Sequence, residues 1–323
     1  MQAIVQDVYG SPDVLHLSEI DRPVVGDGDV LIRVRAAGVD PSVWHLTTGR
    51  PYVARLTGLG VRRPRSRVRG WDVAGVIEAV AKDVTRFKPG DEVFGSGEGT
   101  FAEYASALES RLVAKPADLT FEQAAVIPVS GCTALQALRD AGNVQPGQKV
   151  AVIGAGGGVG TYAVQIAKAL GAEVTGVCST TKVDLVRSIG ADHVVDYTAE
   201  DFADGARHFD LIVETAGKLP FHRVRRCVIP GGALVIVGGD EGGPLIGGLG
   251  RLASARLLTP FVGRKLVGLF AQIRTEDLEY LLELVAAGKV TPVMGTRFPL
   301  AEAPEAVRRL KTEHSRGKAV IVV

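Results

Sequence analysis

The spacing of apolar and polar residues changes character near residue 120. Before that point, short β-prone runs alternate with turns rich in glycine and proline, a pattern typical of antiparallel strands joined by tight connections. The predicted strands of this part cover residues 3–6, 30–36, 75–80, 92–94 and 112–114. We therefore expect a partly barrelled, β-rich domain over residues 1–120.

Beyond residue 120, apolar strands alternate with helices. Thr120 and Gln123 have the spacing of a capping box, which predicts a helix over residues 121–126. The predicted strands that follow cover residues 149–153, 173–177, 193–195, 210–213, 233–237 and 266–270. This alternation predicts an α/β fold with a doubly wound parallel sheet over residues 121–289. The β character returns at residues 290–300 and 319–323, so we assign residues 290–323 to the β-rich domain.

A glycine turn joins the predicted strand 149–153 to an apolar helix. It reads Ala155-x-Gly157-x-x-Gly160, with Gly158 and Val159 between the last two glycines. Glycine lets a pyrophosphate approach the backbone closely, and the free N–H groups at a helix start favour its negative charge. The segment predicts a dinucleotide phosphate site, and a plain strand-to-helix turn is the alternative.

Charge and cysteine usage narrow the class of protein. The 323 residues carry a formal net charge of +1, so no global field directs the chain to nucleic acid or to a membrane surface. Cys132, Cys178 and Cys227 stand far apart without a C-x-x-C pair, which argues against a structural zinc site. The N-terminus lacks the basic start and long apolar run of a signal peptide, so we expect a cytoplasmic protein.

Several phrases of the chain occur in the order found in one protein family. They are Gly70-Trp-Asp-Val-Ala-Gly75, Phe87-Lys-Pro-Gly-Asp-Glu-Val-Phe-Gly95, Thr100-Phe-Ala-Glu-Tyr104, Gly131-Cys-Thr133, Gly190-Ala-Asp-His-Val-Val-Asp-Tyr197 and Gly317-Lys-Ala-Val-Ile321. Because of these motifs, the chain resembles the medium-chain dehydrogenase/reductases, and most of all their zinc-independent quinone oxidoreductase-like branch. The resemblance implies a Rossmann domain, a GroES-like β-rich catalytic domain, and a homodimer. It also implies hydride transfer from NADPH to a quinone, an enone or a related activated carbonyl.

Residues 178–182 bear on which dinucleotide is bound. An NAD-specific fold places an acid about 20 residues beyond the glycine turn, whereas this stretch has hydroxyls and a lysine. Ser179 and Lys182 suit a 2′-phosphate, and the resemblance adds Tyr197, so NADP(H) is the expected cofactor. A polar turn with a capping hydroxyl and a solvated lysine is the alternative.

The resemblance also implies residues at the nicotinamide end. Thr133 matches a position that faces the ring, and Gly238 and Gly239 match the loop over it. Zinc-dependent relatives carry a cysteine where Asp40 stands and a His-Glu pair where Trp71-Asp72 stands. We therefore expect no metal.

Asp40, Ser42 and His45 are the candidate catalytic residues. Without zinc, the charge that develops on a reduced acceptor needs a proton donor, and the resemblance directs this turn-rich segment at the nicotinamide. We expect Asp40 or Ser42 to donate, with His45 as a relay to solvent. The plainer alternative is that Asp40 caps a turn and His45 lies on the surface. Related reductases read Asn-Pro-x-Asp where this chain has Asp40-Pro41-Ser42-Val43, which keeps rival functions open: alcohol oxidation or ketone reduction, NADPH sensing, or a redox-neutral reaction.

Two further segments bear on the substrate, expected to be a small apolar carbonyl or quinone. Residues 50–69 contain seven arginines and no acid, which fits a solvated loop, a site for an anionic group or, more weakly, for nucleic acid. Residues 244–265 are apolar and could line a pocket through Leu249, Leu252, Leu257 and Phe261, or simply pack in the core.

Overall fold

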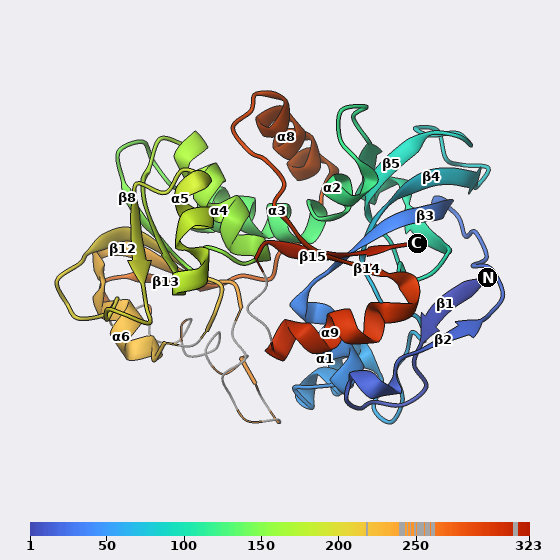
Figure 1. The fold of residues 1–323 in the computed structure, drawn as a ribbon, viewed down its shortest axis with the longest axis horizontal. Helices are drawn as coiled ribbons and strands as arrows, with labels where there is room; N and C mark the ends of the chain where they lie inside the picture. The colour runs from blue at the N-terminus through green and yellow to red at the C-terminus, as the bar shows by residue number, and fades with distance from the viewer. Residues whose placement is uncertain are drawn as a thin grey trace. The chain divides into compact units, whose positions relative to one another are not determined.

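The computed structural model describes residues 1–217, 219–238, 243, 245, 247, 248, 250, 255, 259, 262–312 and 316–323. The chain forms two compact units (Figure 1). The β-rich unit comprises residues 1–132, 273–282 and 292–323, and the Rossmann unit comprises residues 133–272 and 283–291. Within the described residues, no helix has both the length and the apolar character needed to cross a membrane.

The Rossmann unit is built on a parallel sheet with the strand order β10-β9-β8-β11-β12-β13. This order reverses between β8 and β11, and dinucleotides bind at such a reversal in doubly wound folds. The strands are β8 (Lys149–Ile153), β9 (Glu173–Cys178), β10 (His193–Asp196), β11 (Phe209–Glu214), β12 (Val228–Ile236) and β13 (Lys265–Gly268). Its helices are α4 (Gly158–Ala169), α5 (Val183–Ser188) and α6 (Phe221–Arg226), with a π-helical segment over Gln136–Ala141.

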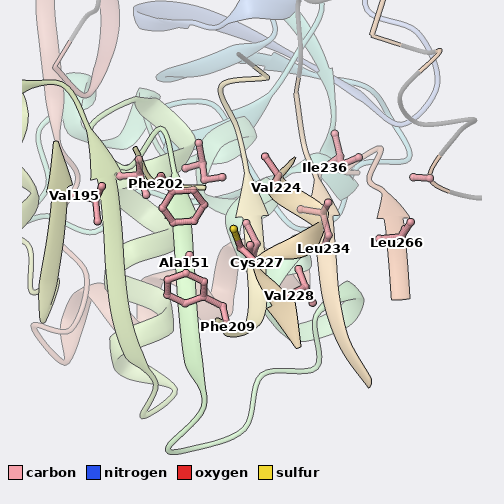
Figure 2. Close-up of a cluster of buried hydrophobic side chains, with 14 residues drawn as sticks. Ala151, Val195, Phe202, Phe209, Val224, Cys227, Val228, Leu234, Ile236 and Leu266 are labelled. Atoms are coloured by element: carbon pink, nitrogen blue, oxygen red, sulfur yellow. The ribbon is translucent and has the colours of Figure 1, made fainter. Parts of the chain in front are cut away.

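Apolar side chains from one face of this sheet form a continuous core (Figure 2). The rings of Phe202 and Phe209 stack with centroids 5.6 Å apart, and both side chains are buried. Ala151, Leu234 and Leu266 contribute from three of the strands. This core holds the strands in register, so the loops at their carboxyl ends have a fixed base.

The β-rich unit is organised around the long strand β3. Its sheet order is β14-β15-β3-β4-β5-β7, with β6 also paired to β3, and a separate hairpin joins β1 to β2. The strands are β1 (Gln2–Val5), β2 (His16–Glu19), β3 (Asp29–Val39), β4 (Asp72–Val80), β5 (Glu92–Ser96), β6 (Tyr104–Leu108), β7 (Leu112–Ala114), β14 (Met294–Pro299) and β15 (Lys318–Val322). Its helices are α1 (Pro41–Thr48), α2 (Phe121–Ala125) and α9 (Ala303–Thr312), and α9 lies beside α1 (Figure 1).

Two helices continue from one unit into the other along the chain, α3 (Pro128–Leu135) and α8 (Thr275–Ala286). The capping box at Thr120 and Gln123 is confirmed, since each side chain bonds the other residue's backbone N–H. At the C-terminal end of the sequence, β15 pairs antiparallel with β3. By contrast, β14 and β15 run parallel, which requires a crossover, and the unpredicted helix α9 supplies it.

Candidate functional site

The glycine turn connects β8 to α4 in the Rossmann unit. A Cβ at Gly160 would lie 2.1 Å from the carbonyl oxygen of Gly154 and 2.8 Å from the Cα of Ala155. Any side chain at Gly160 would therefore push the helix away from the turn. The 12-residue helix α4 begins directly after Gly157, and its first backbone N–H groups provide the donors and positive dipole end that a phosphate needs.

Ala155 stands where the fingerprint ordinarily has its first glycine, and the structure accommodates it. Its side chain is fully buried, and its N–H donates to the carbonyl oxygen of Val177 at 3.0 Å. The methyl carbon lies 3.2 Å from where a Cβ would stand at Gly176 of β9. Packing over a glycine of the neighbouring strand explains why alanine is tolerated here.

The carboxyl ends of β9 and β10 bring together the residues predicted to bind the 2′-phosphate. Ser179 follows β9, and its carbonyl oxygen accepts a hydrogen bond from the Lys182 N–H at 2.9 Å. The Lys182 stem covers Gly156 of the glycine turn, because a Cβ there would stand 2.6 Å from the lysine Cδ. Tyr197 follows β10, its N–H donates to the Cys178 carbonyl at 3.1 Å, and its side chain is exposed. The three residues therefore share one edge of the sheet with the glycine turn.

An acidic residue at the same edge escaped the sequence reasoning. Asp196, the last residue of β10, accepts hydrogen bonds from the hydroxyls of Thr180 at 2.6 Å and Thr198 at 2.7 Å. These bonds lower the pKa of the Asp196 carboxyl, so it is ionised at neutral pH. In the sequence, the available signal was its place directly before Tyr197; in the structure, Asp196 pairs with Cys178 of β9. The charge of Asp196 opposes a phosphate here, and any preference for NADPH must overcome that repulsion.

The positions matched to the nicotinamide end lie near strand ends and in α3. Thr133 is buried within α3. Gly238 follows β12, and a Cβ there would stand 2.9 Å from the carbonyl oxygen of Thr215, which follows β11. Gly239 lies outside the described residues, as do Leu249, Leu252, Leu257 and Phe261.

In the β-rich unit, Asp40 begins a helix rather than a turn, which corrects the expectation of a turn-rich segment. Asp40 is the N-cap of α1, with Pro41 in the first helical position. Its Oδ1 accepts hydrogen bonds from the Ser42 N–H at 2.9 Å and from the Ser42 hydroxyl. Its Oδ2 is buried and has no hydrogen-bond partner among the residues that the structure describes. Asp40 thus combines the capping role with a buried, unused oxygen.

His45 lies one turn beyond Ser42 on the same helix. Its Nδ1 is 2.9 Å from the carbonyl oxygen of Arg50, and because a carbonyl only accepts, Nδ1 carries the proton in this arrangement. The ring also meets Trp44 edge-on, with centroids 5.3 Å apart. These contacts fix the orientation of the imidazole at the start of the arginine-rich segment.

A buried ion pair next to Asp40 was not anticipated. The ammonium of Lys318 on β15 contacts Asp72 Oδ2 on β4, and the two side chains are 2% and 0% exposed. The other oxygen, Oδ1, accepts the N–H of Val129 at the start of α3 at 3.0 Å. The pKa of the Asp72 carboxyl is raised to about 6: burial raises it most, the Lys318 charge opposes the rise, and the Asp40 charge adds to it. Asp40, Asp72 and Lys318 are therefore electrostatically coupled.

The arginine-rich segment is partly structural. Arg55 lies over the rings of Tyr9 at 4.2 Å and Tyr52 at 4.7 Å, and Arg67 pairs with Asp7. Arg69 is buried, which lowers its pKa to about 10. Arg62, Arg63 and Arg65 are exposed, as the solvated-loop interpretation expects.

Comparison with known proteins places the chain in a family. Residues 26–117 match the alcohol dehydrogenase GroES-like domain, residues 135–223 the C-terminal domain of alanine dehydrogenase/PNT, and residues 189–321 the zinc-binding dehydrogenase family. Quinone-oxidoreductase QR1 of Triphysaria versicolor is 32% identical over 99% of this chain and 98% of its own length. Human NAD(P)H oxidoreductase RTN4IP1 is 33% identical over 100% of this chain and 89% of its own. The quinone oxidoreductase structure from Coxiella burnetii superposes with a TM-score of 0.87 at 31% identity, covering 100% of this chain and 99% of the other.

The chain belongs to the medium-chain dehydrogenase/reductase superfamily, in its quinone oxidoreductase-like branch. The fold expectation is thereby confirmed: a six-stranded parallel Rossmann sheet accompanies a GroES-like β-rich domain. An oxidoreductase activity follows from this membership. The names of the relatives place QR1 in the chloroplast and RTN4IP1 in the mitochondrion, so a cytoplasmic location stays a prediction.

Zinc-dependent members of the superfamily raise the question whether the equivalent positions here fit a metal. Asp72 already pairs with the ammonium of Lys318, and a divalent cation at the same oxygen would be repelled by it. Asp40 already accepts a hydrogen bond from Ser42 at one carboxylate oxygen. Among the described residues there is no group of three or more His, Cys, Asp or Glu side chains suited to a metal ion. These residues do not fit a zinc site.

We expect purified protein to contain far less than stoichiometric zinc, because the ammonium of Lys318 competes for the only buried carboxylate of β4. Elemental analysis of protein produced with added zinc would measure this. A chelator should leave the reductase rate intact. Bound zinc near one ion per chain, lost together with activity on chelation, would contradict the prediction.

Proposed function

We propose that this oxidoreductase reduces a quinone, an enone or a related activated carbonyl with NADPH, without a metal. Full-length similarity to quinone oxidoreductases supports the acceptor class. The proposal rests on one feature in each unit: a phosphate cradle at Gly160 in the Rossmann unit, and in the β-rich unit a buried carboxyl, Asp40, whose Oδ2 has no hydrogen-bond partner among the described residues. Reduction of such acceptors requires a hydride and a proton. The phosphate cradle would hold the cofactor that supplies the hydride, and Asp40 would supply the proton.

The cofactor part of the proposal rests on the Rossmann unit. The N–H groups at the start of α4 would hold the pyrophosphate, and Ser179, Lys182 and Tyr197 would hold the 2′-phosphate. When bound, NADPH supplies the hydride. The name of the human relative, an NAD(P)H oxidoreductase, supports a nicotinamide cofactor of either kind. The lysine and hydroxyls at the end of β9 favour NADPH.

The proton part rests on the start of α1. The Ser42 hydroxyl donates to Asp40 Oδ1. When this hydroxyl turns to the acceptor and loses its proton, a protonated Asp40 carboxyl beside it can supply the replacement. A hydroxyl at the second helical position also lies where the helix N-terminus stabilises developing negative charge. His45 lies one turn further along and connects this position to the exposed arginine-rich loop. We assign Asp40 and Ser42 to proton donation and His45 to exchange with solvent.

The test is the rate of NADPH oxidation against quinones, enones, aldehydes and ketones, with alcohol oxidation by NADP⁺ measured in parallel. Asp40→Asn and Ser42→Ala should each lower kcat/KM on the best quinone or enone by roughly 100-fold, the scale of general acid catalysis. Thr48→Ala is the matched control, because this hydroxyl lies at the other end of α1 and donates to the Trp44 carbonyl. Turnover confined to alcohols and ketones would replace the proposal with the dehydrogenase alternative, and full rates in both variants would leave the proton to water.

Lys182→Ala should reduce the preference for NADPH over NADH by roughly 1 to 3 kcal/mol, the contribution of a charge-assisted hydrogen bond. The loss should appear in the dissociation constant of NADPH, measured by fluorescence titration, and not in that of NADH. Asp196→Asn is the complementary variant: removing the opposing charge should tighten NADPH binding selectively. Equal affinities for the two cofactors in the native protein would refute the 2′-phosphate site.

A further inference from the structure

The carboxylate of Asp72 belongs to a larger buried group of charges in the β-rich unit. Lys318 contacts its Oδ2 from β15, and the start of α3 donates to its Oδ1 through Val129. Asp40 lies close enough for its charge to affect Asp72. Gly38, two residues before Asp40, leaves room for the ion pair beside β3: a Cβ there would stand 2.8 Å from both Asp72 Oδ2 and the Cε of Lys318.

The charges of this group do not balance. Asp40 and Asp72 are 3% and 0% exposed, and Lys318 is 3% exposed, so two buried carboxylates face one ammonium. Burying an uncompensated carboxylate is strongly unfavourable, and coupled carboxyls relieve that cost by sharing a proton. Asp40 Oδ2, which has no partner among the described residues, is an oxygen at which that proton can reside.

Two further groups that the structure describes near this cluster, the Cys132 thiol and the Val129 N–H, carry no full positive charge. Cys132 of α3 feels the charges of Asp72 and Lys318, and burial raises the pKa of its thiol, so it stays neutral. Asp277, in the first turn of α8, contributes to the raised pKa of the Cys132 thiol. The Val129 N–H contributes only the partial positive charge of a helix start.

We propose that Asp40, Asp72 and Lys318 form one buried cluster that stores the proton consumed in each reduction. This inference rests on the proposed function. Asp40 and Ser42 are the donors to the substrate, whereas Asp72 and Lys318 are positioning residues that set how tightly the proton is held. In each turnover an O–H bond at Asp40 or Ser42 breaks, its proton joins the reduced acceptor, and the cluster gains one negative charge. Solvent then returns one proton, and the hydride accounts for both electrons.

The cluster predicts opposite effects for its two positioning residues. The rate of reduction should fall as the pH rises through the point at which the stored proton leaves. Asp72→Asn removes a competing negative charge, leaves Asp40 facing Lys318, and should move this midpoint to lower pH by about one unit or more. Lys318→Met removes the compensating ammonium and should move the midpoint to higher pH by a similar amount. Lys318→Arg keeps the charge and should retain the native midpoint.

Two measurements test the proposal. The first is kcat/KM against pH for the native protein and these three variants; unchanged midpoints, or shifts in the same direction, would show that the ion pair is only structural. The second is a carbon-13 NMR titration of aspartate carboxyls in the native chain without substrate, with signals identified by Asp40→Asn and Asp72→Asn. One carboxyl of the pair should still hold a proton near pH 6, as the pKa of Asp72 indicates.

The result of the NMR titration does not depend on whether the protein reduces any acceptor. If no acceptor is reduced, the proposed function fails while the titration still decides whether the cluster holds a proton. If acceptors are reduced but both carboxyls have fully ionised at ordinary aspartate values, near pH 4, the stored proton is refuted and the proposed function survives. If Lys318→Met does not fold, the direction in which Asp72→Asn moves the pH midpoint, together with the titration, still decides the proposal.

Discussion

Replacing Gly160 with alanine should destabilise the Rossmann unit by about 3 kcal/mol and abolish NADPH binding. The added methyl group would stand 2.1 Å from the Gly154 carbonyl oxygen, so α4 must shift away from the turn. Alanine ordinarily stabilises a helix by up to about 1 kcal/mol relative to glycine, so a net loss would identify the steric contact as the cause. Thermal unfolding followed by circular dichroism, with NADPH titration, measures both effects.

Gly157→Ala is the matched variant in the same turn. Gly157 has a φ of −92°, which alanine adopts readily, and the nearest atom to its added Cβ would be 3.4 Å away. We expect this variant to keep the native melting temperature and to weaken NADPH binding at least tenfold, because the methyl group occupies space at the start of α4 where a phosphate approaches. Native stability together with native NADPH affinity would exclude the turn as the phosphate site, and intact binding in Gly160→Ala would exclude the packing argument.

The sequence allowed prediction of features that depend on neighbouring residues. The glycine turn between β8 and α4 is local, and so is the capping box at Thr120, whose two partners stand three residues apart. The helix α1 was missed because Asp40-Pro41 is as typical of a turn as of a helix start, and the following Val43 and Trp44 do not decide between them. The helix α9 was obscured by its charges, although Glu305 and Arg309 have the spacing of a helical ion pair.

The charge cluster could not be predicted, because its partners are separated by most of the chain. Lys318 and Asp72 are 246 residues apart and meet only because β15 and β4 both pair with β3. In the sequence, Lys318 and Asp72 belong to two separate motifs of the family, Gly317-Lys-Ala-Val-Ile321 and Gly70-Trp-Asp-Val-Ala-Gly75, and nothing in either motif links them. Only the strand order gives these residues a joint role, and Asp40, which directly follows β3, lies near enough for its charge to affect Asp72.

Lys318→Met should destabilise the β-rich unit by roughly 3 to 5 kcal/mol at pH 8, because it leaves Asp72 buried and charged without its partner. The double variant Asp72→Asn/Lys318→Met should recover most of that loss, since no buried charge is left unpaired. The coupling between the two positions should therefore be roughly 2 kcal/mol or more. Urea unfolding followed by tryptophan fluorescence measures this unit selectively, because both tryptophans, Trp44 and Trp71, belong to it.

The penalty of Lys318→Met should also depend on pH in a definite direction. The pKa of Asp72 in the native fold is raised to about 6, above its unfolded value near 4, so the folded state holds a proton that the unfolded state releases between these pH values. Stability from this group is therefore present at low pH and is lost as pH rises through that window. Removing Lys318, whose charge opposes the rise, should move the folded pKa higher still. The difference in unfolding free energy between variant and native protein should consequently be small at pH 5 and largest at pH 8. Two outcomes would contradict this explanation: an equal loss of unfolding free energy at both pH values, or a loss in the double variant equal to the sum of the losses in the two single variants. Either would mean that Lys318 stabilises the fold through packing of its stem and not through the charge of Asp72.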